Sequence, residues 1–86
     1  MNKAKYVIVN GSAIVFSAAI THSDMVGFNQ KADGAGFVTF FTKTDSYGDK
    51  IVVAECYGES ISLGVTSREE QDSIIVTQQI CRNFYY

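Results

Sequence analysis

The 86-residue chain contains no proline and only two cysteines, Cys56 and Cys81. Two cysteines cannot build the disulfide framework of a small secreted domain, so we expect both to be reduced thiols. The chain also lacks any apolar run close to the roughly 20 residues that a membrane-spanning helix needs. Its 7 Lys and Arg against 9 Asp and Glu leave no excess of positive charge for wrapping duplex DNA.

The composition describes one small folded domain. Hydrophobic residues make up 47% of the chain and charged residues 19%, a balance too apolar for a disordered tail. The chain shows no linker, internal repeat or low-complexity segment, so we expect residues 1–86 to form a single domain. No signal peptide precedes the first strand-like stretch, which predicts a cytoplasmic protein.

Four runs of β-branched and aromatic residues predict four strands. Asn10-Gly11 lies between the first two runs, and this dipeptide favours the type I′ turn of a hairpin because both residues tolerate positive φ. We expect each strand to pair with the next along the chain, as an antiparallel meander. Between the second and third strands, residues 21–24 fit a short helical turn and residues 29–36 an exposed loop, but no single conformation is predicted for residues 18–36. The strands are predicted at residues 6–9, 13–16, 37–42 and 51–57.

An amphipathic helix is predicted over residues 67–83, which makes the expected fold α+β: a four-stranded antiparallel sheet with a C-terminal helix. Ser67 with Glu70 fits a capping box, and Thr66 with Glu69 fits the same pattern one residue earlier. The helical period leaves Ile75 alone on the polar side. The predicted apolar side consists of Ile74, Val76, Ile80, Cys81 and Phe84.

The predicted strands are apolar on both faces. In the third strand, for example, Phe37 and Phe41 share one face while Val38 and Phe40 share the other. One helix can cover only one face, so the other must contact residues 18–28, a second subunit or both. Large exposed apolar patches are rare on monomers, and a chain this short buries only about 60% of its surface on folding. We therefore expect a homo-oligomer, with coverage by residues 18–28 alone as the alternative.

The densest polar stretch, Cys-Tyr-Gly-Glu-Ser-Ile-Ser-Leu-Gly at residues 56–64, leads from a strand towards the helix. Free N–H groups at a helix N-terminus favour an anion, serine hydroxyls and an arginine would add donors, and a tyrosine can stack on a base. This is not a Walker loop, and a plain connection whose serines bond to their own backbone is the alternative. The predicted ligand-binding residues are Tyr57, Gly58, Ser60, Ser62, Gly64 and Arg68, with His22 as a single further contact.

Catalytic constellations are poorly supported. His22 with Asp24 and a serine would resemble a hydrolase triad, but residues two apart do not face each other well, and no Gly-x-Ser-x-Gly sequence presents either candidate serine, Ser60 or Ser62. The two cysteines lack the paired spacing of metal ligands. We therefore expect no enzyme, no metal site and no cofactor. A structural hydrogen bond or a single ligand contact is the expected role of His22.

Three stretches together resemble small accessory proteins encoded by tailed bacteriophages. They are the opening Tyr-Val-Ile-Val-Asn-Gly hairpin, residues 19–24 (Ala-Ile-Thr-His-Ser-Asp), and residues 56–64 with Ser67-Arg68. Such phage proteins include oligomeric sponges that sequester host immune nucleotide signals without cleaving them. The resemblance implies binding rather than catalysis in the host cytoplasm, and it transfers no site residues.

Residues and resemblance together predict a non-enzymatic anti-defence protein that binds and sequesters a small anionic ligand as a homo-oligomer. A cyclic nucleotide immune signal fits this description. The alternative is a protein-binding module that inhibits or redirects a host protein through an apolar sheet face. Spread-out lysines and a crowded acidic C-terminal half argue against single-stranded nucleic acid as the partner.

Overall fold

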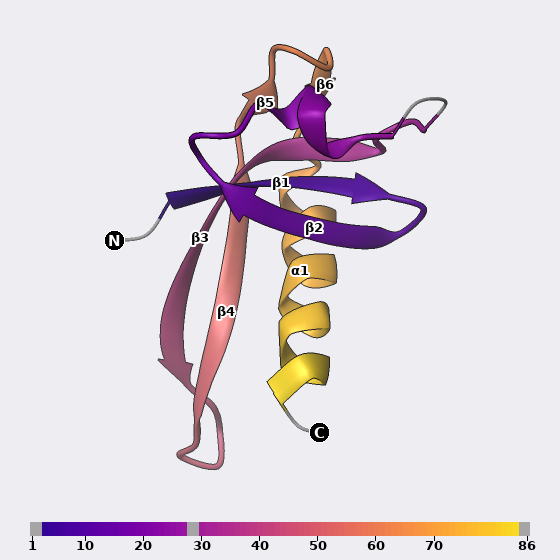
Figure 1. The fold of residues 1–86 in the computed structure, drawn as a ribbon. Helices are drawn as coiled ribbons and strands as arrows, with labels where there is room; N and C mark the ends of the chain where they lie inside the picture. The colour runs from indigo at the N-terminus through magenta and orange to yellow at the C-terminus, as the bar shows by residue number, and fades with distance from the viewer. Residues whose placement is uncertain (1–2, 28–29, 85–86) are drawn as a thin grey trace.

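The computed structural model describes residues 3–27 and 30–84, and side chains as far as residue 80. It is an α+β fold in which four antiparallel strands form one sheet and a single α-helix follows them (Figure 1). Within the described residues, no helix is both long and apolar enough to cross a bilayer. The elements are β1 (Lys3–Val9), β2 (Ser12–Ser17), the 3-10 helix η1 (His22–Met25), β3 (Gly34–Thr44), β4 (Lys50–Tyr57), β5 (Glu59–Ser60), β6 (Val65–Thr66) and α1 (Glu69–Phe84).

The Asn10-Gly11 hairpin is confirmed. Both residues have positive φ, 54° and 78°, and Val9 pairs with Ser12 directly across the turn. These are the two positive φ values that a type I′ turn requires. A second turn, at residues 45–49, joins β3 to β4, and within it Asp45 Oδ1 accepts hydrogen bonds from the backbone N–H groups of Tyr47 and Asp49.

The meander order was wrong. The sheet order is β2-β1-β3-β4, so β3 pairs with β1 and not with β2. Burial gives the physical reason: Tyr6, Val7 and Ile8 of β1 are all at most 1% exposed, which suits a central strand with a neighbour on each side. In β2 most side chains are exposed, as on an edge strand.

The exposed loop predicted at residues 29–36 was also wrong over its second half. β3 begins at Gly34, and Ala32 together with residues 34–36 is buried; residues 28–29 lie outside the described part. Gly34 is needed here because a Cβ on it would lie 2.1 Å from Asp72 Oδ2 on α1. Glycine is typical of loops, but here Gly34 allows the start of β3 to approach α1 closely.

The helix packs on the face of the sheet that carries Tyr6, Ile8 and Val38, here called the inner face. Its orientation differs from the prediction, because Ile75 packs against the core whereas Ile74 is 52% exposed. The helix is rotated so that buried Asp72 and Val76, one turn apart, both face the sheet. The predictions for the side chains of Cys81 and Phe84 fall outside the described side chains.

Helix α1 also bonds to both edges of the sheet. On β4, Ser73 Oγ accepts the N–H of Cys56 at 2.8 Å and Thr77 Oγ1 accepts the N–H of Ala54 at 3.0 Å. On β2, the Gln79 amide accepts the N–H of Ala13 at 2.9 Å and donates to its carbonyl at 2.6 Å. The helix thus partners backbone groups that edge strands leave free.

The opposite, outer face is covered over part of its area by the chain itself. Val7, Val9, Phe16 and Ala35 form a second buried cluster on this face. The side chains that cover it come from two segments: Met25 and Val26 at the end of η1, and Leu63 and Val65 at the start of β6. Residues 25–26 therefore contribute only part of this cover, and residues 63–65 supply the rest, so the alternative of coverage by residues 18–28 alone was wrong.

Candidate functional site

The loop between Gly58 and Gly64 is held by its own hydrogen bonds. Ser60 is 1% exposed; its Oγ accepts the N–H of Leu63 at 3.2 Å and lies 3.3 Å from Ser62 Oγ. The N–H of Gly64 donates to the Ser60 carbonyl at 2.9 Å. Gly58 and Gly64 both have positive φ, as the two bends of the loop require. Ser60 therefore stabilises the loop. This agrees with the alternative in which the serines of this connection bond to their own backbone.

At the start of α1, the side chain of Asp72 bonds to the residue that precedes the helix, Arg68. Asp72 Oδ2 accepts the backbone N–H of Arg68 at 3.1 Å, while Oδ1 accepts Nε of Arg68 at 3.0 Å and lies 2.8 Å from Nη2. The predicted capping boxes with Glu70 or Glu69 were wrong, because Asp72 is the residue that reaches back to the cap. The guanidinium and the N–H of Arg68, which were expected to hold phosphate, are thus engaged by Asp72.

Asp72 belongs to a buried network that we call the Asp72 cluster, formed with Tyr6, Ser67 and Arg68. The Tyr6 hydroxyl donates to Asp72 Oδ2 at 2.6 Å and lies 2.6 Å from Ser67 Oγ. Burial, together with the hydrogen bond to the Asp72 carboxylate, raises the pKa of the Tyr6 hydroxyl far above its usual value. Burial also raises the pKa of the neighbouring Cys56 thiol to about 11, so Cys56 is protonated at neutral pH.

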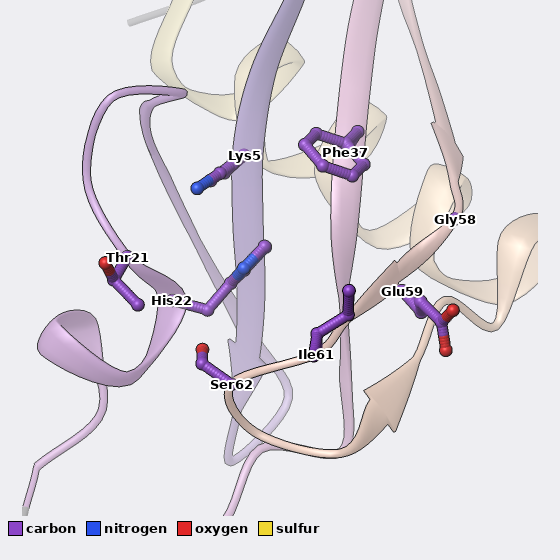
Figure 2. Close-up of a pocket in the computed structure, with 8 residues that line it drawn as sticks. All are labelled: Lys5, Thr21, His22, Phe37, Gly58, Glu59, Ile61 and Ser62. Atoms are coloured by element: carbon purple, nitrogen blue, oxygen red, sulfur yellow. The ribbon is translucent and has the colours of Figure 1, made fainter.

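A pocket of about 470 Å³ opens on the outer face, on the other side of the sheet from the Asp72 cluster (Figure 2). We call it the Lys5 pocket. It lies between β1, the start of η1, β3 and the Gly58–Gly64 loop, where the cover of the outer face ends. It is lined by Lys5, Thr21, His22, Phe37, Gly58, Glu59, Ile61 and Ser62.

His22 lines this pocket and is fixed in one orientation. It is 4% exposed, its Nε2 lies 2.8 Å from the Gly36 carbonyl, and its ring meets Phe16 and Phe37 edge-on at centroid distances of 5.5 and 6.0 Å. A carbonyl only accepts, so Nε2 donates, and Nδ1 has no hydrogen-bond partner among the described residues. The expected structural hydrogen bond of His22 is therefore present, and the same side chain borders the pocket.

The remaining side chains divide the Lys5 pocket into a polar and an apolar side. In the view of Figure 2, Thr21 lies to the left of His22, Lys5 above it and Ser62 below it, whereas Phe37 and Ile61 both lie to its right. The Glu59 carboxylate points away from Lys5. The Lys5 amino group donates to the Ile20 carbonyl at 2.9 Å, which uses one of its three donors and leaves two.

Phe37 is held from two directions. Its ring lies 6.0 Å from the Tyr57 ring at an interplanar angle of 30°, and the Lys3 amino group stands 4.2 Å from its centroid. Lys3 and Lys5 both extend from β1 on the outer face, because they are two residues apart on one strand. The apolar side of the Lys5 pocket therefore adjoins two positive charges.

Three of the predicted ligand-binding residues come together here: His22, Gly58 and Ser62. The others do not line the Lys5 pocket. Ser60 Oγ bonds within its own loop, Arg68 bonds to Asp72, and the Tyr57 ring lies beside Phe37 as its cross-strand neighbour. The lining residues that the sequence analysis missed are Lys5, Thr21, Phe37, Glu59 and Ile61.

Two of the missed residues carried a usable signal. Lys5 lies on the same alternation as the apolar Val7 and Val9, so a strand that begins before residue 6 places this lysine at the border of the outer apolar surface. Ile61 is 89% exposed at the tip of a polar loop, where an isoleucine has no packing role. Thr21 and Phe37 had no such signal, since a threonine before a helical turn and a phenylalanine in a strand are ordinary structural residues.

No family model, curated protein or solved structure matches this chain. Function must therefore be argued from the geometry. Among the side chains described, residues 3–27 and 30–80, no three His, Cys, Asp or Glu gather as metal ligands would.

Proposed function

We propose that this protein is a non-enzymatic binding domain whose Lys5 pocket captures a small anionic molecule with a flat ring. One observation carries the proposal: donor groups and an apolar surface stand on opposite sides of one fixed histidine in a pocket of about 470 Å³. Ligand pockets are commonly about 300–1,000 Å³, largely apolar, with a few placed polar groups. A nucleotide has the matching division, an anionic phosphate at one end and a base at the other.

The ligand contacts follow from the lining. The anionic end lies on the Lys5 ammonium and on the hydroxyls of Thr21 and Ser62, where charge-assisted hydrogen bonds form. The ring lies against Phe37 and Ile61. His22 Nδ1 accepts one hydrogen bond from an N–H or O–H of the ligand, which gives selectivity for a molecule with a donor at that position.

Binding without turnover agrees with the state of the potential nucleophiles. Ser60 Oγ already takes part in two contacts within its loop, and the buried Cys56 thiol is held protonated. An activated serine or cysteine instead has an adjacent base or a lowered pKa. The resemblance to phage accessory proteins supports sequestration of a cyclic nucleotide immune signal as the biological role.

Calorimetric titration with a panel of cyclic mono-, di- and trinucleotides tests this proposal. We expect one member to bind and to be recovered intact after heat denaturation of the complex. Lys5→Gln should raise its Kd by about 10- to 100-fold, because a hydrogen bond to a charged group is worth roughly 1.5–3 kcal/mol. Lys50→Gln, an exposed lysine at the far end of β4, is the matched control and should leave the Kd unchanged.

Two results would overturn the assignment. Absence of heat with every nucleotide would remove the ligand class, and recovery of a cleaved product would show an enzyme. Equal affinity of the Lys5→Gln and Lys50→Gln proteins for a bound nucleotide would place its phosphate elsewhere on the molecule.

A further inference from the structure

Near the β3–β4 turn, no other segment of the described chain is found packed on the outer face of the sheet. β3 and β4 extend beyond β1 and β2 as a two-stranded ribbon (Figure 1). Side chains alternate along a strand, and directly paired residues share a face, so every second residue of the ribbon points outward. We call the outward side the ribbon face. It consists of Thr39, Phe41 and Lys43 of β3 and their respective partners Glu55, Val53 and Ile51 of β4.

The middle of the ribbon face is apolar. Phe41 is 41% exposed, and its cross-strand partner Val53 and the adjacent Ile51 are half-buried. The segments that cover the outer face elsewhere pack on Val7 and Ala35, nearer the other end of β3. Helix α1 packs on the inner side of β4 and bonds to Ala54, so the outward apolar row is the side of the ribbon that is open to a partner.

The charges of the ribbon face are arranged for a second copy of the same chain. Lys43 lies two residues from Phe41 towards the hairpin tip, and Glu55 lies two residues from Val53 in the opposite direction; both are exposed. A twofold rotation that reverses the strand direction and stacks two ribbon faces brings Lys43 of each copy over Thr39 of the other, beside Glu55. Lys3 of β1 flanks Thr39 on its other side, but its amino group is turned towards the Phe37 ring, 4.2 Å from the centroid, and so away from the incoming Lys43. The alternative stacking, with strands running the same way, brings like charges together instead.

We propose that two copies dock ribbon face to ribbon face with their strands running in opposite directions. Phe41 and Val53 fill the centre, and two Lys43–Glu55 pairs flank them, as an isologous interface requires. Two short strands give less area than the roughly 800 Å² per partner of a standard interface, so the dimer is weak and needs micromolar or higher concentration. Phe37 lies one outward position from Thr39 on β3, so the Lys5 pocket opens near this interface.

Charge reversal tests the proposed geometry. Sedimentation equilibrium up to several hundred micromolar should show a reversible dimer of the unmodified chain. Lys43→Glu or Glu55→Lys alone should raise the dimer Kd by at least about tenfold, because each single change places two like-charged pairs across the interface. The double variant, Lys43→Glu with Glu55→Lys, should recover the original Kd within about threefold, since both pairs are again complementary.

An equimolar mixture of the two single variants gives the sharpest readout. Each weakly dimerising variant should find its complement in the other, so the mixture associates although its components do not. Lys50→Glu, which belongs to the same ribbon but alternates to its opposite side, is the matched control and should dimerise normally. Circular dichroism of every variant shows that the fold is retained, and recovery by mixing is independent of any loss of stability.

Several outcomes would overturn the proposal. A chain that stays monomeric throughout leaves the ribbon face to a different protein. A dimer that both single variants form as well as the unmodified chain uses another surface. A mixture that fails to associate while the single variants remain folded rejects the antiparallel pairing. None of these outcomes depends on which ligand the Lys5 pocket takes, so they are separable from failure of the nucleotide titration.

Discussion

Tyr6 and Lys5 are neighbours on β1, yet their side chains belong to polar groups with opposite properties. Tyr6 points to the inner face and joins the Asp72 cluster, whose described members satisfy one another at distances of 2.6–3.1 Å. Lys5 points to the outer face and borders a pocket with donors and an acceptor to spare. Within the described residues, no buried side-chain polar atom lacks a partner. The spare hydrogen-bonding capacity of the Lys5 pocket is therefore at its accessible surface, where a ligand can use it.

The comparison separates two uses of polar residues in a small domain. A closed network such as the Asp72 cluster fixes how the helix sits on the sheet, and its loss is felt as lost stability. A pocket bordered by accessible groups contributes little to folding, and its loss is felt as lost binding. The two can be told apart by measuring unfolding and ligand affinity on the same variants.

The largest effect on stability is expected for Asp72→Ala. It removes the shared acceptor of Tyr6 and Arg68 and empties a fully buried position, which should lower the free energy of unfolding by about 3 kcal/mol. Glu70→Ala is the matched control, because Glu70 is an exposed acid in the same helical turn and should change stability by less than about 0.5 kcal/mol. Urea denaturation measures both. Equal effects of the two substitutions would contradict the role given to Asp72.

A smaller effect is expected from pH. The pKa of the Cys56 thiol is raised to about 11 in the folded protein from an ordinary value of 9.0, so folding favours the protonated thiol. The resulting stability is complete below pH 9 and is lost as the pH rises towards 11, with about 1 kcal/mol gone by pH 10. Cys56→Ala should remove this part of the pH dependence. An identical fall of stability in both proteins between pH 9 and 10 would show that Cys56 does not cause it.

The smallest effect on stability, and the sharpest contrast with the Asp72 cluster, is expected for Ser62→Ala in the Lys5 pocket. Ser62 is exposed, so the free energy of unfolding should stay within about 0.5 kcal/mol of the unmodified value. The affinity for an anionic ligand should nevertheless fall by about three- to tenfold, as expected for one neutral hydrogen bond. Thermal unfolding and calorimetry on one sample measure both quantities. A variant that loses stability but binds normally would reverse the assignment of Ser62.

Features that depend on neighbouring residues were predictable from the sequence. The Asn10-Gly11 turn, the strands and the C-terminal helix follow from local turn chemistry and hydrophobic period, and the structure has all of them. The order of the strands depends on a long-range choice, because β3 can pair with either strand of the first hairpin. Only the burial of β1 on both faces distinguishes the two, and an apolar run alone does not say which neighbour it acquires.

The candidate site was predicted less completely for a similar reason. Glu69, Glu70 and Asp72 all stand in the first turn of α1, and no local rule says that Asp72 is the one that turns inward. That choice depends on Gly34 and Tyr6, which are distant in sequence, and it determines that Arg68 is engaged. Arg68 is paired with Asp72, so the cation that lines the pocket beside the Gly58–Gly64 loop is Lys5, from the opposite end of the chain.

Ser73, Thr77 and Gln79 of α1 bond to backbone groups of the two edge strands, β4 and β2, so these groups lose their partners if α1 is removed. Removal or detachment of α1 would unmask both sheet borders in one event, together with the apolar surface beneath. A fragment so exposed on two sides can recruit further fragments in both directions, which is the requirement for open-ended fibrillar growth. The C-terminal helix therefore acts as a safeguard against aggregation as well as a structural element.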